Sequence, residues 1–367
     1  MLRYILSGLM FFHALIHLLG FVKGYKLADI SQLMLPVSKI GGTIWMLAFL
    51  LLISSTFLFV GKINGWWWFA FSGVILSQVL IIGAWQDAKF GSILNLIILI
   101  VAITAFAKSR FNNMVQTEIN QMFQSTPVSE AAILTQENIQ HLPVPVQQWL
   151  QQSGAIGKEI IHNVWLKQKV WMKTKPGQKE WIEAEADQFF TVARPAFVWK
   201  VSMQMMPMLE VVGRDKYMDG KGSMIIKALG LINMVNAADE KIDQGTLQRY
   251  LAEIIWFPSA AVSPYIHWES IDSVSAKATM NFEGISGSGI FHFNGQGQFK
   301  KFTTQRYMGS GEEAVLREWE ITSQAYREIN GFEIPVKLEV VWKLEEGDFN
   351  WLNLEIIDIK YNQQQTQ

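Results

Sequence analysis

The sequence contains no cysteine among its 367 residues. Disulfide bonds, thiolate catalysis, iron–sulfur clusters and cysteine-based zinc sites are therefore excluded. A chain without thiols suits either side of a membrane, so this absence does not identify the compartment.

Charged residues are also scarce, at 17% of the chain against about 25% in typical soluble domains. The scarcity is concentrated in residues 1–110, which hold eight basic and two acidic side chains, whereas the remainder holds 23 basic and 30 acidic ones. The acidic remainder argues against nucleic acid as a partner and against electrostatic attraction to anionic lipid.

Four apolar runs in the first 108 residues are each about as long as the ~20 residues that cross ~30 Å of hydrocarbon as a helix. They cover 4–22, 42–60, 66–85 and 91–107, and lysines lie at their ends. The basic residue Arg3 precedes the first run, but the run lacks a small-x-small cleavage site and three more runs follow. We therefore expect it to be retained rather than removed as a signal peptide.

These runs predict an integral, multi-pass protein of the inner (cytoplasmic) membrane, with a four-span domain over 1–108. The Lys and Arg residues that flank the spans are divided equally between the two sides, four on each, so the positive-inside rule does not orient the chain. Membrane lipid is the partner that this region predicts.

Two histidines lie inside the first run. His13 and His17 are four residues apart, so on a helix both imidazoles share one face, as a metal pair or one side of a haem site requires. The spacing matches that of zinc proteases, but Ala14 stands where their general-base glutamate belongs. Alternatively, both histidines hydrogen-bond to neighbouring helices or line a small polar cavity. An absorbance spectrum would reveal haem, and the sequence itself identifies no cofactor.

We expect a polar, helix-forming juxtamembrane linker over 109–141 and a β domain over 142–367. From residue 159 onward, apolar and polar residues alternate in several stretches, which is typical of antiparallel strands with one apolar face. Pairs such as Asp219-Gly220 and Asn330-Gly331 favour tight turns between them. We count about ten strands, interrupted by one helix near 244–256.

The predicted fold class is therefore α+β: a four-helix transmembrane region followed by a large antiparallel half-barrel or curled sheet with a helix on its concave face. The apolar faces of the strands carry many tryptophans. Aromatic side chains of this kind usually fill a broad core, and they can also line an apolar cleft for a lipid or acyl chain.

The segment 243–258 concentrates the chemistry of the domain. Arg249 and Glu253 are four residues apart on the expected helix, where an exposed ion pair contributes only ~0.3–0.5 kcal/mol. Alternatively, the helix lies across the concave sheet, and both side chains meet the head group of a ligand while Trp256 meets its apolar part. The candidate ligand-binding residues are Arg249, Glu253, Trp256, Tyr250, Trp199, Asp215 and His267.

Several short motifs in this domain resemble those of an uncharacterised bacterial membrane-protein family, a domain of unknown function, over residues 141–361. They include Arg194-Pro195-Ala196-Phe197-Val198-Trp199, Arg249-Tyr250-Leu251-Ala252-Glu253, Trp256-Phe257-Pro258 and Gly331-Phe332-Glu333-Ile334-Pro335. The layout is also loosely similar to the half-barrel of periplasmic lipoprotein-carrier proteins. That similarity implies an extracytoplasmic β domain but no activity.

Three functions remain open for the β domain. A membrane-anchored binding or carrier module for a lipid, lipoprotein or other apolar ligand requires an apolar groove under the 244–256 helix. An enzyme that acts on a lipid-like substrate requires a titratable cluster in that groove, with Glu253, Asp215 or His267 as acid or base. A structural or assembly protein requires a filled core. We favour the first because no spacing matches a catalytic triad, a metal cluster or paired carboxylates. The sequence identifies no protein partner.

Overall fold

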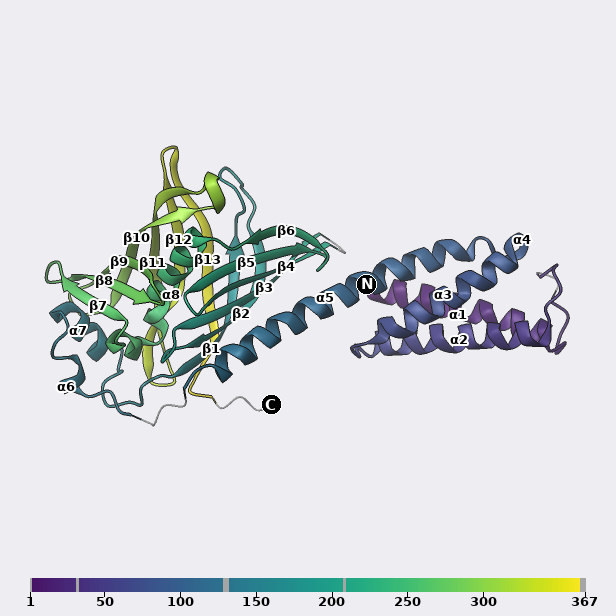
Figure 1. Cartoon of the computed structure of the whole chain (residues 1–367), viewed down its shortest axis with the longest axis horizontal. Coiled ribbons are helices and arrows are strands. Elements are labelled where there is room, and N and C mark those ends of the chain that lie inside the picture. The colour runs from purple at the N-terminus through teal and green to yellow at the C-terminus, as the bar shows by residue number, and fades with distance from the viewer. Residues whose placement is uncertain (1, 31–32, 128–131, 207–208, 364–367) are drawn as a thin grey trace. The chain divides into compact units, whose positions relative to one another are not determined.

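The computed structural model describes residues 2–30, 33–127, 132–206 and 209–363. It divides the chain into two compact units, Met1–Asn112 and Asn113–Gln367. The first unit is helical, and the second is built on a large curled sheet (Figure 1). The expected fold class, with helices at the N-terminus followed by a curled antiparallel half-barrel, is therefore confirmed.

Four helices of the chain are long and apolar enough to cross a membrane. They are α1 (Leu2–Gly24), α2 (Lys39–Val60), α3 (Trp66–Gly83) and α5 (Gly91–Gln124), with the short α4 (Trp85–Ala88) between the last two. Their starts lie within three residues of the expected runs. Helix α5 extends beyond its apolar run into the segment expected to be a linker, and it ends in the second unit.

Helices α1 and α2 pack closely because α1 has glycines where the two helices meet. A Cβ atom on Gly24 would lie 2.8 Å from the Cα atom of Gly42, and one on Gly20 would lie 2.2 Å from the ring of Trp45. Small residues at such contacts let helix backbones approach, as they do between helices in lipid. Large apolar side chains, including Phe12, point outward instead.

The second unit contains a single antiparallel sheet of 13 strands among its described residues. The strands are β1 (Asn163–Met172), β2 (Ile182–Thr191), β3 (Ala196–Met206), β4 (Leu209–Met218), β5 (Lys221–Ala228), β6 (Ile232–Ala237), β7 (Ile266–Ser270), β8 (Ser275–Phe282), β9 (Ile285–Phe293), β10 (Phe299–Met308), β11 (Val315–Ile329), β12 (Phe332–Leu344) and β13 (Gly347–Tyr361).

The spatial order of the strands is β6-β5-β4-β3-β2-β1-β13-β12-β11-β10-β9-β8-β7. Neighbours in the sheet are consecutive in sequence except at the centre, where β1 pairs with β13. The two edges are thus β6 and β7, which are joined in sequence by α8 (Glu240–Glu253). The sheet is an open curl whose two edges are connected by one helix.

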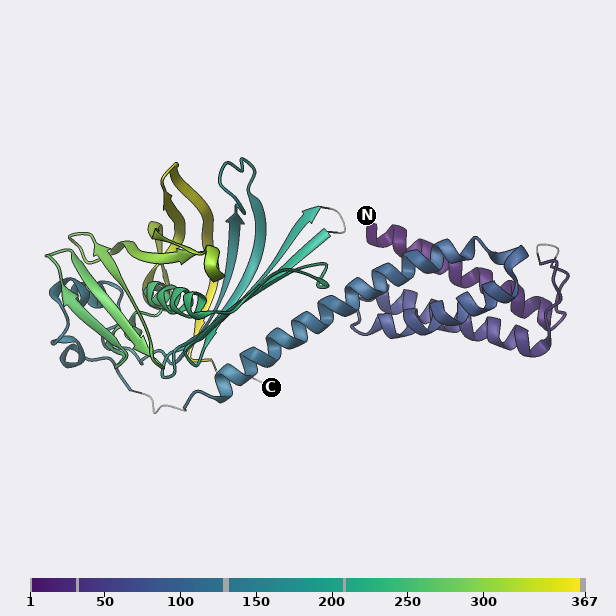
Figure 2. The same ribbon diagram turned by 45° about the horizontal axis from the view of Figure 1, so that its top comes forward.

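Helix α8 lies inside this curl (Figure 2) and contacts β4, β5, β8, β9 and β10. It begins at Asp239, whose carboxylate accepts hydrogen bonds from the backbone N–H groups of Lys241 and Ile242, both at 2.9 Å. It continues as the 3-10 turns η1 (Ile254–Trp256) and η2 (Pro258–Val262). The expected helix near 244–256 therefore starts four residues earlier, because Asp239 caps it.

Three shorter helical segments complete the unit. They are α6 (Gln136–Ile139), α7 (Val144–Gln152) and η3 (Gly311–Glu313). Helix α7 begins next to Pro143 and ends just before Ser153-Gly154, where Gly154 has a φ of +69°. A proline at the start and a left-handed glycine past the end form the expected helix boundaries.

The expected count of about ten strands was too low. Strand β1 alternates strictly between buried and half-buried residues, which is the pattern that sequence periodicity detects. In β4, five consecutive residues from Val211 to Asp215 are buried, because α8 covers its concave face while Glu118 of α5 contacts Arg214 on the other. Strands covered on both faces lose the alternation that would reveal them.

Helix α8 can lie close to the sheet because residue 222 of β5 is a glycine. A Cβ atom there would lie 2.3 Å from Thr246 Oγ1 and 2.6 Å from the carbonyl oxygen of Ile242. We expect Gly222→Val to push the helix away and to lower the free energy of unfolding by about 1–3 kcal/mol. Chemical unfolding of the full chain in detergent measures this loss.

The matched control is Gly295→Ala, because a Cβ atom at that turn meets nothing within 4 Å. Equal stability of the two variants would show that α8 does not depend on the contact at Gly222.

Candidate functional site

A cavity of about 160 Å³ lies between α8 and the concave face of the sheet. Its wall is mainly apolar and includes Met172, Val201, Met203, Ile226, Leu338 and Val340, together with the rings of Trp199, Trp256, Trp319 and Trp351. Charged residues line it too: Arg249 and Glu253 from the helix, Arg214 and Asp215 from β4, and Arg306 from β10. An apolar cavity with a few polar groups is the usual form of a small-molecule site.

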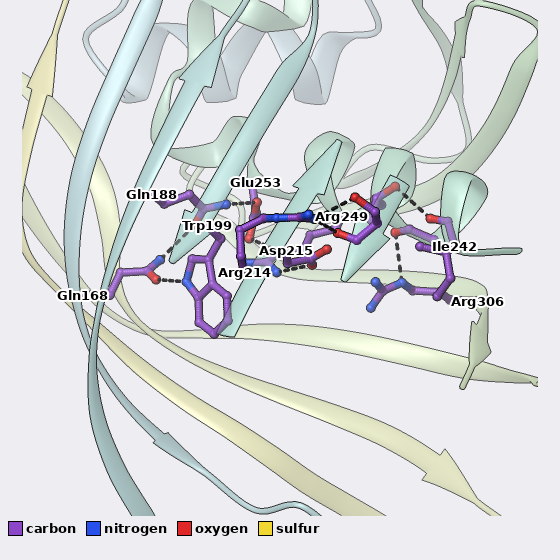
Figure 3. A network of polar contacts seen from close by, with 12 residues as sticks. Gln168, Gln188, Trp199, Arg214, Asp215, Ile242, Arg249, Glu253 and Arg306 are labelled. Carbon is purple, nitrogen blue, oxygen red and sulfur yellow. Dashed lines mark hydrogen bonds and ion pairs between the residues drawn. The ribbon is translucent and has the colours of Figure 1, made fainter. Parts of the chain in front are cut away.

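Arg249 is at the centre of the charged part of the site (Figure 3). Its Nη1 atom lies 2.7 Å from Asp215 Oδ2 and its Nε atom lies 2.9 Å from Glu253 Oε1. The three side chains are only 14%, 3% and 7% exposed, respectively. Arg249 and Glu253 therefore pair as expected. The interpretation of this pair as an exposed helix ion pair is wrong, because α8 faces the concave side of the sheet.

Two buried amides extend this network along the sheet (Figure 3). Gln188 Nε2 donates to Glu253 Oε2 at 2.8 Å, and Gln168 Nε2 donates to Gln188 Oε1 at 3.3 Å. Trp199 Nε1 then donates to Gln168 Oε1 at 2.8 Å. Sequence reasoning missed both glutamines. Both lie on the apolar faces of β1 and β2, and this position could have indicated a buried hydrogen-bond network, because a buried polar side chain needs a partner.

Strand register brings these groups together. Trp199 of β3 is directly opposite Asp215 of β4 on one side and Gln188 of β2 on the other. Directly opposite residues share a face of the sheet, so all three point toward α8. The guanidinium group of Arg249 lies 5.0 Å from the ring centroid of Trp199, within the range of a cation–π contact.

Burial and charge act against each other in this network. Burial opposes the charge of Arg249, but Glu253 and Asp215 outweigh it, and the pKa of Arg249 is raised. Burial also raises the pKa of the Glu253 carboxyl above its ordinary value of 4.5, although Arg249 and Gln188 act in the opposite direction. Asp215 Oδ1 is buried and has no hydrogen-bond partner in the described part of the chain.

Arg306 differs from the other arginines of the cavity wall. Its Nε atom donates to the Gly245 carbonyl at 3.0 Å, and its guanidinium group lies 4.6 Å from the ring centroid of Trp319. Burial lowers the pKa of Arg306 to about 10, so it stays charged at neutral pH. Across residues 2–363 as described, no carboxylate pairs with it, and its two terminal nitrogens remain available to a ligand.

The opposite face of β4 carries a second buried ion pair. Arg214 Nε lies 2.9 Å from Glu118 Oε2, and Lys216 Nζ lies 2.8 Å from Glu118 Oε1. Glu118 belongs to the end of α5 within the second unit. Because Arg214 precedes Asp215, the same strand contacts α5 on one face and the cavity network on the other.

The remaining candidate residues occupy different places. Trp256 is 1% exposed, lines the cavity and donates from Nε1 to the Pro335 carbonyl at 3.0 Å. Tyr250 is fully buried and donates to the Thr191 carbonyl at 2.9 Å, away from the cavity wall. His267 is exposed on β7 and does not line the cavity, because only alternate residues of that strand face inward.

The two histidines of α1 are buried within the helical unit. His13 Nε2 lies 2.8 Å from Asn95 Oδ1, and His17 Nε2 lies 2.8 Å from Ser77 Oγ. His17 Nδ1 lies 2.8 Å from the His13 carbonyl. The contacts with Asn95 and Ser77 are hydrogen bonds to neighbouring helices, as in the alternative hypothesis, whereas the one with the His13 carbonyl lies within α1. Within the described residues, no cluster of three or more His, Asp or Glu side chains is arranged for a metal ion.

Comparisons with known proteins identify a family for this chain. The profile of a family described as a family of unknown function (DUF6544) matches residues 132–354, which is more than half of the chain. No curated protein matches. Among solved structures, a LolA superfamily protein from Nitrosomonas europaea matches at 10% identity with a TM-score of 0.35, over 61% of this chain and 96% of that one. A likeness at that level bears on neither ligand nor activity.

Replacement of the central arginine tests the energetics of the network. We expect Arg249→Met to lower the free energy of unfolding by about 3–5 kcal/mol at neutral pH, because two buried carboxylates lose their counter-charge. Arg249 acts to lower the pKa of the Glu253 carboxyl, so its removal raises that pKa further above 4.5. A carboxyl with a raised pKa in the folded state stabilises the fold at low pH, and this contribution is lost as the pH rises through the raised pKa. The loss should therefore be smaller at pH 5 than at pH 8.

Chemical unfolding of the full chain at both pH values measures this difference. Arg317→Met is the matched control, since Arg317 pairs with Glu345 at the surface, where such pairs contribute about 0–1 kcal/mol. A pH-independent loss in Arg249→Met would contradict the role assigned to Glu253.

Proposed function

The chain belongs to the DUF6544 family of unknown function, and we propose that it is a membrane-anchored binding module whose β domain holds an apolar or amphiphilic ligand under α8. The observation that carries this proposal is the apolar cavity whose wall also holds a buried, hydrogen-bonded charge network. A module that binds lipid needs both parts, an apolar wall for a chain and polar groups for a head group.

The size of the cavity limits the ligand. Its volume of about 160 Å³ is close to the ~150 Å³ of an apolar cavity that accepts benzene. A chain segment of a few carbons therefore fits under α8 as the helix stands. A longer acyl chain must extend out of the cavity along the sheet, or the helix must move outward.

Arg306 is the group best suited to a ligand head group. Arg249 is already paired with Asp215 and Glu253, so its charge is not available to a ligand. Arg306 presents its terminal nitrogens in a plane held against Trp319, and a planar guanidinium group matches carboxylate or phosphate oxygens. The proposed ligand therefore carries acceptor oxygens next to its apolar segment.

Two observations weigh against the other functions. An enzyme would need Glu253 or Asp215 to exchange protons with a substrate, but Arg249 binds both carboxylates, and Gln188 occupies the second oxygen of Glu253. A purely structural domain needs no cavity, and a void of this size would cost stability. The binding module accounts for both the cavity and the unpaired Arg306.

We place α1, α2, α3 and α5 in the inner membrane and the β domain on its extracytoplasmic side. The length and hydropathy of the four helices support their placement in the membrane. The extracytoplasmic side of the β domain rests on the loose similarity of its expected layout to the half-barrel of periplasmic lipoprotein-carrier proteins, since the flanking Lys and Arg residues are evenly divided.

Because the chain has no cysteine, one introduced thiol reports the orientation. Gln296→Cys, in the exposed turn between β9 and β10, should react with a membrane-impermeant maleimide in intact spheroplasts. Reaction only after lysis would reverse the orientation.

Filling the cavity tests the binding function. Val340 lines the cavity, so Val340→Phe should occupy its volume and exclude a ligand while the larger side chain keeps the core packed. Native mass spectrometry of the detergent-purified chain, followed by lipid extraction, should show a lipid bound to the wild type and less than a tenth of it in the variant.

Ile357→Phe is the matched control, because Ile357 is exposed on β13. It should retain the lipid fully. Arg306→Gln should lower retention about tenfold through loss of the charged hydrogen bonds, a difference of about 1.4 kcal/mol. An empty wild-type cavity, or equal retention in Val340→Phe and Ile357→Phe, would overturn the proposal.

A further inference from the structure

An exposed apolar rim lies at one end of the strands that form the cavity wall. It consists of five large side chains, which are 39–63% exposed: Met205, Met206, Leu231, Ile232 and Met234. The first two end β3, and the other three belong to the turn before β6 and to β6 itself. We use the term apolar rim for these five residues. Soluble surfaces rarely gather this many large apolar side chains in one place.

Backbone pairing brings the two parts of the apolar rim together. Met206 pairs with Leu209 of β4, and the Leu229 N–H donates to the Glu210 carbonyl at 2.7 Å. Ala228 of β5 then pairs with Ile232. Strands β3 and β6 are three positions apart in the sheet, so the two parts are about 14 Å apart at a spacing of ~4.8 Å per strand.

The apolar rim continues the apolar wall of the cavity. Met203 of β3 lines the cavity, and the register beyond a bulge in β3 places Met206 on the same face. Ile226 of β5 also lines the cavity, Ala228 follows it on the same face, and Ile232 is directly opposite Ala228. One concave apolar surface therefore runs from the cavity to side chains that are exposed at the end of the strands.

Strand β6 is an edge of the sheet, yet it lacks the features that usually protect one. Its sequence, Ile232–Ala237, contains no charged residue and no proline. Exposed apolar edges aggregate unless something covers them. The same chain carries four helices of membrane length, so a tethered β unit meets a bilayer at a high effective concentration. Unbranched methionine side chains also adapt to irregular apolar surroundings.

We propose that the apolar rim inserts into the surface of a lipid bilayer and that ligand passes along it between the bilayer and the cavity. The insertion does not depend on the proposed binding function, whereas the passage of ligand rests on it. The contact is apolar rather than electrostatic, because none of the five side chains is charged. It should therefore persist at high salt.

Fluorescence in liposomes tests the insertion. The cysteine-free chain allows one label at a time, so Ile232→Cys and the control Gln296→Cys are each labelled with an NBD fluorophore in the full chain. The proteins are reconstituted in phosphatidylcholine liposomes that contain a lipid with a nitroxide on its acyl chain. We expect quenching at least threefold stronger at position 232 than at position 296, in low and in high salt.

Two outcomes would overturn the insertion. Equal quenching at both positions would show that the apolar rim does not enter lipid. Efficient disulfide formation between two Ile232→Cys chains, independent of lipid, would show instead that a second copy covers β6.

Lipid loading separates this inference from the proposed function. A delipidated double variant, Ile232→Asn with Met234→Asn, should load lipid from liposomes at least fivefold more slowly than Ile271→Asn, which changes an exposed apolar residue outside the apolar rim. Val340→Phe should fail to load but keep the quenching at position 232. A cavity that stays empty in every chain would overturn the binding function and the passage of ligand, but not the insertion. Equal loading rates would overturn the passage alone.

Discussion

The buried contact of Arg249 with Asp215 and Glu253 fixes how the second unit is arranged. It joins α8 to β4 at a point where neither partner is well hydrated, so each charge depends on the others. Because α8 connects the two edge strands β6 and β7, the contact also holds the open sheet in its curl. A full barrel would have removed both edges by pairing them. Here both edges remain, and the buried contact of α8 with the sheet leaves room beside it for a cavity.

The charged side chains that reach the cavity, Arg249, Arg306, Asp215 and Glu253, are not equally paired. Arg249 binds both carboxylates, so among the described residues Arg306 has no carboxylate partner and Asp215 Oδ1 has no hydrogen bond. An apolar wall beside Arg306 is in keeping with the proposed ligand, which carries acceptor oxygens next to its apolar segment.

Much of this architecture could be predicted from the sequence, because it follows from periodicity. The four apolar runs became helices, the glycine-containing turns fell between strands, and the segment around Arg249 became the helix within the curl. What could not be predicted depends on contacts between distant residues. The pairing of Arg249 with Asp215 is set by register across β3 and β4, and the amides of Gln168 and Gln188 have no local pattern. Arg306, 57 residues after Arg249, is brought to the cavity only by the curl of the sheet.

The pairing of β1 with β13 has a consequence for how the protein is made. Strand β1 can pair with β2 at once, but its other partner in the sheet, β13 (Gly347–Tyr361), follows only after all the other strands. The hairpins can form early, but the sheet stays in two halves until β13 has been synthesised. The four apolar helices precede β1 in the chain, so they can fold while the two halves of the sheet are still separate. Closure of the sheet is therefore a long-range step of folding that is separate from the formation of the helical unit.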